Sequence, residues 1–413
     1  MSPRDRDQLS RRDFVALSAL GIAGLAMPRG VRAGDDDELK AERMLYIGTY
    51  TDDGRSKGVY QLRMSPATGA LTIVGVAAET TNPSFVILGR EGRAAYAVNE
   101  VGEAGGRPAG GATAFARAAS SGALRQLGHE KTHGTFPCYA STDRTGRFLF
   151  VANYGSGNVA MFPIHAGGDI GPASAIIQHK GTGPNKERQE GPHAHCAITD
   201  PANRFVLVAD LGIDRVMVYP FDAKSGKLTT TAAAEGVAAP GAGPRHLAFG
   251  HGGRVLYVTN ELASTVTAFR YDANSGALTE LQTVPAVSEG LALEGANAAA
   301  TASAATTNEP ADIHVHPNGR FLYMSNRGHN SIAVFAIDGA TGRLSPLQLM
   351  STGGDWPRNF AIDPTGEFLL VANQKSDSIV TLRIDRTTGK LAPTGHTLTL
   401  PVPVCVRFAA PES

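Results

Sequence analysis

The sequence has little charge and no excess of either sign. Its 38 Lys and Arg residues balance 38 Asp and Glu residues, and these four types make up 18% of the chain. A protein that binds nucleic acid or an anionic membrane usually carries a basic patch that raises its net charge. We therefore expect no nucleic-acid partner and, after removal of any export signal, no membrane partner.

Cysteine is also scarce, with only three residues in the chain. Cys138, Cys196 and Cys405 form no Cys-x-x-Cys pair and no Cys/His spacing of the zinc-binding kind. Each lies in an apolar or proline-adjacent stretch, so we expect buried, unpaired thiols. The one Gly-x-Ser-x-Gly match, at residues 54–58, lies between two expected strands and not at the strand-to-helix turn of a nucleophile elbow. A hydrolase built on this chain would therefore use water rather than a serine nucleophile.

What the sequence does contain is a repeat. A Pro, a few polar or aromatic residues and an apolar run lead to a Gly-Arg type turn, and a second apolar run then ends in Asn or Asp. The turn residues recur at intervals of roughly 50 residues, which indicates stacked structural units; they are Arg93, Arg147, Arg204, Arg254, Arg320 and Glu367. Short β-branched runs between glycine turns are strands. The sequence therefore predicts an all-β fold, a β-propeller.

The repeats predict seven blades within residues 44–413. The opening MLYIGTYTDDGRSKGVYQL supplies the later strands of one unit, and the terminal PVPVCVRFA supplies its missing first strand. Strands from both ends of the chain would then close the ring within one blade and remove exposed sheet edges. The longest interval contains residues 284–310, which are rich in Ala, Thr and Asn and lack a strand period. We expect an inserted low-complexity loop there.

The N-terminal segment has the layout of an export signal. Arg11 and Arg12 precede a short apolar stretch (14–27), and small residues follow. This stretch is too short to span a bilayer comfortably, and the paired arginines indicate the twin-arginine (Tat) route. We expect a signal peptide over residues 1–33, a polar leader over 34–43 and a periplasmic or extracellular product. The alternative is a short hydrophobic N-terminal helix.

The innermost strand of each repeat, directly after the Pro, carries unusual residues. An ordinary apolar core would exclude so many polar and ionisable groups at one position; they include His193, His195, Arg245, His246, Asp312, His314, Arg358 and Asn359. Innermost strands line the central channel of a propeller. We therefore expect several imidazole and guanidinium groups in a solvated channel mouth.

A second position follows the Asn or Asp that ends the second strand. The Asn or Asp itself is nearly constant, which is typical of a side chain that caps a turn or bonds the neighbouring backbone. The next residue varies among Glu100, Tyr154, Leu211, Glu261, Arg327 and Gln374. Variable polar groups beside a constant scaffold indicate a functional site.

The residue types at these positions suit acid–base and anion chemistry. His193 or His195 could exchange a proton near neutral pH, and Glu261 could do so if its surroundings tuned its pKa. Guanidinium groups bind carboxylates and phosphates and stabilise oxyanions; the candidates are Arg245, Arg327 and Arg358. Any single one of these could be a satisfied structural residue, but the cluster favours a site.

Two His-x-His pairs resemble metal ligands. His193 with His195, and His314 with His316, would share a face of a regular strand. No carboxylate-rich motif accompanies either pair, which disfavours a metal site. We expect no metal and no other cofactor.

Long stretches, among them RQEGPHAHCAITD, GPRHLAFGHGGRVLYVTNELASTVTAF and IHVHPNGRFLYMSNRGHNSIAVF, resemble the seven-bladed propeller lactonase family. That family includes propeller-type 6-phosphogluconolactonases and carboxy-muconate lactonizing enzymes. The resemblance begins at Met44 and implies a metal-independent site at the channel mouth. Tyr139 stands where the family usually has a histidine. The His, two Arg and Glu assigned to catalysis in the lactonizing enzyme match His195 (or His193), Arg245, Arg327 and Glu261.

The expected function is hydrolysis of an anionic sugar lactone, similar to 6-phosphogluconolactone, by water attack. His195 or Glu261 would act as the general base, and Arg245 and Arg327 would bind an anionic group or the oxyanion. The further substrate contacts would be His193, His246, His314, Arg358 and Glu100. Alternatives are a muconate-type lactonizing or isomerising enzyme and a non-catalytic propeller that binds a ligand or protein. Tat export would expose the enzyme to extracytoplasmic sugars, so the phosphorylation state of the lactone stays open.

Overall fold

The computed structural model describes residues 42–295 and 308–409. The predicted signal peptide and most of the polar leader lie outside the described residues, as does the middle of the expected insertion. Within the described part of the chain, every regular element is a β-strand except one 3-10 turn, η1 (His251–Gly253). No helix in this part is long and apolar enough to cross a membrane.

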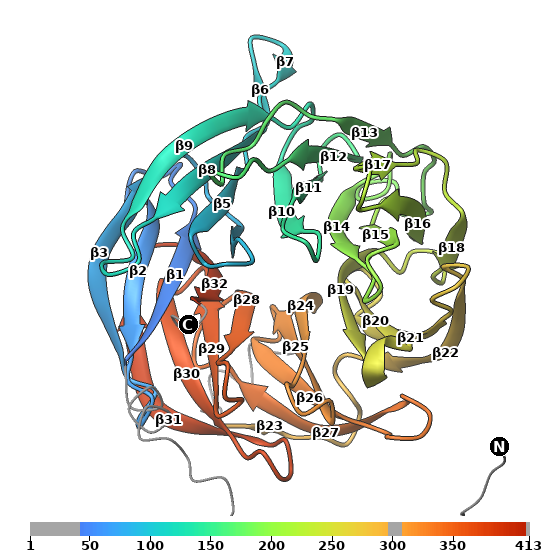
Figure 1. Cartoon of the computed structure of the whole chain (residues 1–413). Coiled ribbons are helices and arrows are strands. Elements are labelled where there is room, and N and C mark those ends of the chain that lie inside the picture. Colours follow the sequence, from blue (N-terminus) through green and yellow to red (C-terminus); the bar gives the residue numbers. More distant parts are fainter. Residues whose placement is uncertain (1–41, 296–307, 410–413) are drawn as a thin grey trace, which may run out of the picture. The chain divides into compact units, whose positions relative to one another are not determined.

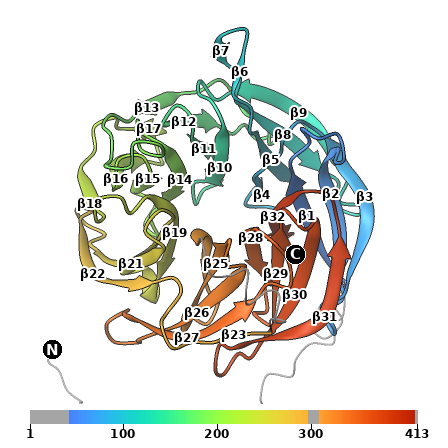
Figure 2. The same cartoon turned by 180° about the vertical axis from the view of Figure 1, so that it is seen from behind.

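Seven sheets stand side by side around a central axis (Figure 1), and the view from behind shows the same ring (Figure 2). Each sheet forms one blade, with one strand innermost and the others following outward to the rim. This arrangement confirms the predicted seven-bladed β-propeller.

We number the blades in chain order, each from its innermost strand outward. Blade 1 contains β32 (Pro403–Phe408), β1 (Arg43–Thr49), β2 (Gly58–Met64) and β3 (Leu71–Glu79). Blade 2 contains β4 (Val86–Leu88), β5 (Ala94–Asn99), β8 (Gly111–Arg117) and β9 (Leu124–Lys131), with a separate hairpin of β6 (Glu103–Ala104) and β7 (Arg107–Pro108). Blade 3 contains β10 (Pro137–Thr142), β11 (Phe148–Asn153), β12 (Asn158–Pro163) and β13 (Ala175–Gln178).

The remaining four blades follow the same plan. Blade 4 contains β14 (Ala194–Thr199), β15 (Phe205–Asp210), β16 (Arg215–Asp222), β17 (Lys227–Leu228) and β18 (Ala234–Val237). Blade 5 contains β19 (Pro244–Gly250), β20 (Val255–Asn260), β21 (Thr265–Tyr271) and β22 (Leu278–Pro285). Blade 6 contains β24 (Glu309–Val315), β25 (Phe321–Arg327), β26 (Ser331–Ile337), β27 (Leu344–Ser351) and β23 (Leu293–Glu294). Blade 7 contains β28 (Pro357–Ile362), β29 (Phe368–Asn373), β30 (Ser378–Ile384) and β31 (Leu391–Thr399).

The two ends of the ring meet in blade 1, as the sequence predicts. The C-terminal strand β32 pairs antiparallel with β1, with Val406 opposite Ile47. Ile47 and Val406 are fully buried and pack with Phe368 and Leu370 of blade 7 in one apolar cluster. The closing strand therefore contributes hydrogen bonds within blade 1 and apolar contacts to blade 7.

The Gly-Arg type turns form because an Asp side chain bonds the backbone that the turn leaves unpaired. The Asp143 carboxylate accepts the N–H groups of Arg147 at 2.7 Å and Phe148 at 3.0 Å. Asp200 and Asp363 make the same pair of contacts in blades 4 and 7. This is the local hydrogen bonding for which Asp is favoured in turns.

The nearly constant Asn or Asp at the end of each second strand also bonds the backbone, as expected. The side-chain amides of Asn153 and Asn373 each donate to a carbonyl of the preceding blade, at 3.2 Å. The Asp210 carboxylate accepts the N–H groups of His193 at 2.7 Å and Gly212 at 2.9 Å. These contacts fix the backbone on which the variable residue is mounted.

The insertion differs at its edges from the structureless loop expected over residues 284–310. Strand β22 extends to Pro285, and β24 begins at Glu309. Between them, β23 pairs parallel with β27, where Leu293 lies opposite Leu349. Leu293 packs against the apolar cluster between blades 5 and 6, and this contact explains why a short strand forms in a segment without strand period.

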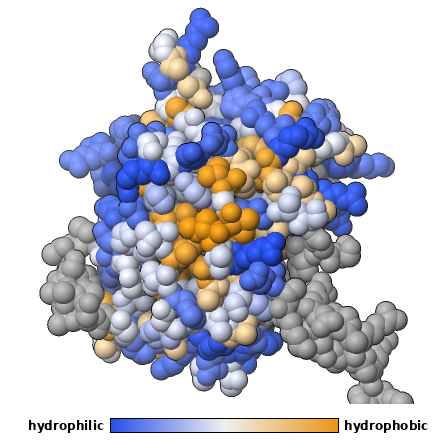
Figure 3. Space-filling view, turned by 90° about the vertical axis from the view of Figure 1, so that its left-hand side faces the viewer, coloured by the Kyte–Doolittle hydropathy of each residue, from blue (hydrophilic) through white to orange (hydrophobic). Residues whose placement is uncertain are grey.

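The outermost strand of blade 1 carries exposed apolar side chains. Ile73, Val74 and Val76 on β3 are 40, 50 and 40% exposed. Figure 3 looks onto this side of the ring and shows an apolar patch among polar surroundings. An apolar edge strand is prone to association with other chains, and this one lies on the rim, at the far end of its blade from the channel.

Candidate active site

The inner strands β14, β19, β24 and β28, which carry candidate residues, each have a β-bulge near their start. The register of pairing shifts between Ala194 and Cys196 in β14 and between Pro244 and Leu247 in β19. The same irregularity occurs in β24 and β28. A bulge inserts an unpaired residue and redirects its side chain. The regular alternation assumed for His193 and His195 therefore does not hold, whereas the bulge of β24 ends at Ile313, before His314 and His316.

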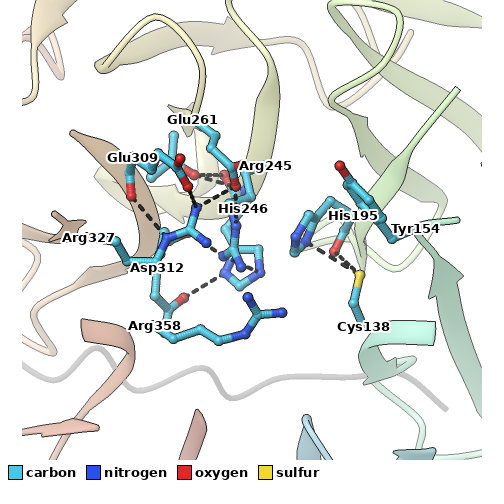
Figure 4. A network of polar contacts seen from close by, with 12 residues as sticks. Cys138, Tyr154, His195, Arg245, His246, Glu261, Glu309, Asp312, Arg327 and Arg358 are labelled. Carbon is cyan, nitrogen blue, oxygen red and sulfur yellow. Dashed lines mark hydrogen bonds and ion pairs between the residues drawn. The ribbon is translucent and has the colours of Figure 1, made fainter. Parts of the chain in front are cut away.

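The centre of the site is the carboxylate of Glu261, which follows β20 (Figure 4). Its Oε1 atom contacts Arg188 Nη2 at 2.5 Å, and its Oε2 atom contacts Arg327 Nη2 at 2.6 Å and Arg245 Nε at 2.9 Å. Arg327 also lies 3.4 Å from the Glu309 carboxylate. One carboxylate thus holds three guanidinium groups that come from different parts of the chain.

The electrostatics keep this centre ionised. Burial alone would raise the pKa of Glu261, but Arg327, Arg245 and Arg188 outweigh it and lower the pKa to about 2. Burial, reinforced by Arg327, lowers the pKa of Arg245 to about 10, so this side chain remains protonated at neutral pH. Glu261 is therefore a weak base, and its charge serves to orient and balance the arginines.

Arg245 and Arg327 lie against the same carboxylate oxygen. Arg245 Nε and Arg327 Nη2 both contact Glu261 Oε2, although neither contact is aligned as a hydrogen bond. The two guanidinium groups therefore concentrate positive charge at one place. Such a pair is suited to stabilise an oxygen atom that gains negative charge.

A hydrogen-bonded chain extends from Arg245 into blade 6. Arg245 Nη1 lies 3.1 Å from His246 Nε2, and His246 Nδ1 lies 2.8 Å from the Asp312 carboxylate. The arginine can only donate and the carboxylate can only accept, so these contacts assign the His246 proton to Nδ1. Burial and Arg245 lower the pKa of His246 to about 4, which keeps the ring neutral at physiological pH.

His195 faces this group from the other side (Figure 4). Its ring centroid lies 5.2 Å from that of His246 and 5.5 Å from that of Tyr154. His195 Nδ1 lies 3.5 Å from the Cys138 sulfur, whereas Nε2 has no hydrogen bond to any described residue. Burial, Arg245 and His246 hold the pKa of His195 well below its ordinary value. The imidazole is therefore neutral, with one nitrogen available.

A second ion pair lies beside the first. Arg358 Nη2 is 3.7 Å from Glu100 Oε1, and the hydroxyl of Tyr50 donates to Glu100 Oε2 at 2.9 Å. The guanidinium carbon of Arg358 also lies 5.5 Å from the centre of the Tyr50 ring. Burial would lower the pKa of Arg358, but Tyr50 and Glu100 raise it overall. Arg358 thus presents a permanent positive charge between Glu100 and the His195 region.

The other candidate histidines have structural partners. His193 stacks on Tyr154 and contacts the Tyr154 carbonyl oxygen at 2.9 Å. His314 Nε2 lies 3.0 Å from the Asp312 carboxylate, whereas His316 Nε2 contacts the carbonyl of Gly366 in blade 7. The two members of each His-x-His pair have different partners. Among the described residues, no group of three or more His, Cys, Asp or Glu side chains is arranged to hold a metal ion.

The site is more enclosed than the solvated channel mouth that we expected. Arg245 is 2% exposed and Glu261 is 3% exposed, and His195 and Arg327 are also buried. The expectation was wrong because three arginines surround the Glu261 carboxylate and the Trp356 ring lies against Arg327. The three cysteines, in contrast, are buried and unpaired as predicted.

Sequence analysis identified most of the site but missed part of it. The structure brings Arg245, Glu261, Arg327 and His246 into direct contact, with His195 beside them. Sequence analysis missed Arg188, which belongs to the irregular segment between β13 and β14, and Glu309, the first residue of β24. Arg188 occupies no repeated position, so comparison of the repeats could not have found it. Glu309 directly precedes the recurrent Pro, where Phe136, Gly243 and Trp356 stand in other repeats, and that position was not compared.

Comparisons with known proteins agree with this description. The family model described as "Lactonase, 7-bladed beta-propeller" matches residues 44–408. A 6-phosphogluconolactonase of Bacillus subtilis is 36% identical over 363 residues, 88% of this chain and 97% of the relative. A 6-phosphogluconolactonase of Formosa agariphila is 31% identical over 77% of this chain and 85% of its own.

A solved structure is similar over the same region. The periplasmic gluconolactonase of Pseudomonas aeruginosa superposes with a TM-score of 0.79 at 31% identity, over 90% of this chain and all of that one. The match therefore includes the whole ring and, with it, the inner strands on which the arginine and histidine side chains are mounted. By fold and by sequence, the chain belongs to the seven-bladed β-propeller lactonase family and is a hydrolase.

Proposed function

We propose that this chain hydrolyses a sugar lactone with water as the nucleophile, at the cluster of Glu261, Arg245 and Arg327. The observation that carries the proposal is the pair of buried guanidinium groups of Arg245 and Arg327, which lie against one carboxylate oxygen beside a neutral imidazole, His195. Hydrolysis of a lactone needs both features, a base for the attacking water and donors for the oxyanion.

The reaction follows from these roles. His195 takes a proton from water as the water oxygen attacks the lactone carbonyl carbon, and the carbonyl oxygen becomes an oxyanion next to Arg245 and Arg327. The ring C–O bond then breaks, and the ring oxygen takes the proton back from His195 as it leaves. The products are the open hydroxy acid and the regenerated imidazole. Glu261 keeps the two arginines in place and is a positioning residue, because its low pKa makes it a poor proton acceptor.

Export remains part of the proposal. The paired arginines and apolar stretch at the N-terminus support Tat translocation, and one similar structure is described as a periplasmic gluconolactonase. A chain folded before translocation needs no disulfides, which agrees with three buried free thiols. We therefore propose that the enzyme acts outside the cytoplasm, where its substrate would be an extracytoplasmic lactone.

The test is turnover of a panel of aldonolactones, corrected for their spontaneous hydrolysis. His195→Ala and Arg245→Ala should each lower kcat/KM by about a hundredfold or more. Arg215→Ala is the matched control, since Arg215 pairs with Glu235 and contacts none of the site residues. Turnover in the lactone-forming direction alone would favour a lactonizing enzyme. Tight binding of a lactone without turnover would favour a non-catalytic propeller.

A further inference from the structure

The ion-paired charges of the site cancel. Four arginines take part, Arg188, Arg245, Arg327 and Arg358. Their partners, together with the His246 partner Asp312, supply four carboxylates, Glu261, Glu309, Glu100 and Asp312. Burial keeps both His195 and His246 neutral. A site for a dianionic phosphate usually has an excess of cationic donors, and these ion-paired groups supply no such excess.

A pocket adjoins the Arg358 end of the site. It has a volume of about 340 Å³, and Glu100, whose carboxylate is shared by Arg358 and Tyr50, forms part of its wall. The same wall includes Tyr50, Asp52, Asp53, Phe136 and Gln374. A substrate whose reacting carbonyl lay among the arginines could extend past Arg358 into this pocket.

The charged groups of the pocket are all carboxylates, those of Asp52, Asp53 and Glu100. Asp52 accepts a hydrogen bond from Asn82, and Glu100 accepts one from Tyr50. Asp53 pairs with Arg55, but Arg55 also pairs with Asp377. One guanidinium group therefore faces two carboxylates, and one of the two negative charges is not balanced within this group. Of the described residues that line the pocket, none is Lys or Arg. Such a wall attracts hydroxyl donors and repels phosphate, which offers only acceptors and negative charge.

One aromatic side chain completes the pocket. Phe136 is 47% exposed, and its backbone has a φ of 51°, which is unusual for a bulky residue. Two hydrogen bonds hold the backbone there: Phe136 N–H donates to the Val101 carbonyl at 2.8 Å, and Tyr154 N–H donates to the Phe136 carbonyl at 2.9 Å. Strain of this kind costs about 1–3 kcal/mol and is concentrated at functional sites. An exposed ring beside carboxylates suits a polyol, whose C–H groups can lie on the ring while its hydroxyls reach the acceptors.

From the charge balance and the pocket we infer that the substrate is an uncharged, unphosphorylated aldonolactone whose hydroxyl-bearing carbons occupy the pocket beside Glu100. The inference rests on the proposed lactonase function and narrows it. It also replaces the anionic substrate expected from the sequence. The pocket acts as a specificity element, because a phosphate group on the distal carbon would meet the carboxylates of Asp52 and Glu100.

The experiment compares kcat/KM for glucono-1,5-lactone and 6-phosphoglucono-1,5-lactone at low and high salt. The unphosphorylated lactone should be preferred by about tenfold or more, since one tenfold step needs only about 1.4 kcal/mol of charge repulsion. The preference should shrink at high ionic strength, because salt screens repulsion between charges but leaves steric exclusion unchanged.

Two variants locate the selectivity. Asp52→Asn and Glu100→Gln should each reduce the preference for the unphosphorylated lactone several-fold, mainly by improving turnover of the phosphorylated lactone. Glu280→Gln, on the exposed face of β22, is the control and should leave this preference unchanged. As a measure independent of turnover, gluconate should inhibit the wild type more strongly than 6-phosphogluconate, and Phe136→Ala should weaken inhibition by both.

The outcomes are distinguishable from failure of the proposed function. A preference for the phosphorylated lactone would overturn the inference while leaving the lactonase function intact. A preference that is insensitive to salt and to both carboxylate substitutions would also overturn it, because the selectivity would then lie outside this pocket. Turnover of neither lactone, nor of any other in the panel, would count against the proposed function itself.

Discussion

Glu261→Gln is the substitution that tests the electrostatic design of the site most directly. Glutamine keeps the shape of the side chain and removes the negative charge that Arg188, Arg245 and Arg327 share. Arg245 is 2% exposed and would keep its charge without a carboxylate partner. Removal of one member of a buried ion pair is strongly destabilising for this reason.

The magnitude follows from the pKa of Glu261. The arginines lower it from the ordinary 4.5 to about 2, after the opposing effect of burial. The difference of 2.5 pH units, at 1.36 kcal/mol per unit, corresponds to about 3 kcal/mol in favour of the folded state. The variant should lose this amount of stability at pH 7, together with roughly a hundredfold in kcat/KM as the two arginines lose their orientation.

The sign of the pH dependence gives a sharper test. Because the folded pKa is depressed, the stabilisation by Glu261 is fully present above pH 4.5 and is lost as the pH falls toward 2. The stability difference between wild type and variant should therefore shrink on acidification. With these two pKa values, it falls to roughly half or less of its neutral value by pH 3.

The assay is urea unfolding, followed by tyrosine and tryptophan fluorescence at several pH values between 3 and 7. Glu309→Gln is the control, because Glu309 also contacts Arg327, at 3.4 Å, but is 32% exposed and contacts no second arginine. Its effect should stay below about 1 kcal/mol. A stability difference for Glu261→Gln that does not change with pH, or one no larger than that of Glu309→Gln, would refute the reasoning.

Three further predictions concern other parts of the chain. Burial and Arg245 depress the pKa of His195, so kcat/KM should stay constant from pH 8 to below 6.5 and fall only at more acidic pH; an acid limb with its midpoint at 6.5 or above would contradict this. Truncation before Pro403 should remove β32, expose the edge of β1 and produce aggregation in size-exclusion chromatography; a soluble monomer of unchanged stability would count against ring closure. Replacement of Arg11 and Arg12 by Lys should leave an uncleaved precursor in the cytoplasm, as judged by immunoblot of cell fractions.

The fold could be predicted from the sequence because its determinants are local. Several turns contain their own Asp and Gly, and Asp143 alone accepts three backbone N–H groups within five residues of itself. The strand runs between such turns are short and apolar, so their number and spacing directly indicate the number of blades. The innermost strand of blade 1 could likewise be assigned to the C-terminus, because PVPVCVRFA has the composition of an innermost strand.

The site could be predicted only where it uses repeated positions. Glu261 and Arg327 follow or end a second strand, and comparison of the repeats singled them out. Arg188 has no equivalent in the other blades, and its contact with Glu261 spans 73 positions in the sequence. The burial of the site residues could not be predicted from the sequence either, because it depends on how many side chains from different blades meet at the site. Alternation failed at His193 and His195 because a β-bulge in β14 redirects the chain there.

Because side chains from several blades meet at the site, we expect catalysis to depend on closure of the ring. The backbone N–H of Val406, in the closing strand β32, donates to the side chain of Asn359 at 2.7 Å, and Asn359 donates to the Asp312 carboxylate at 2.5 Å. Asp312 in turn holds His246, which contacts Arg245. The C-terminal strand therefore contributes to the position of an arginine on the far side of blade 6. Since Arg245, His246 and Glu261 come from blade 5 and their partners come from blades 6 and 7, no single blade contains the site, and loss of the closing strand should abolish lactone turnover as well as solubility.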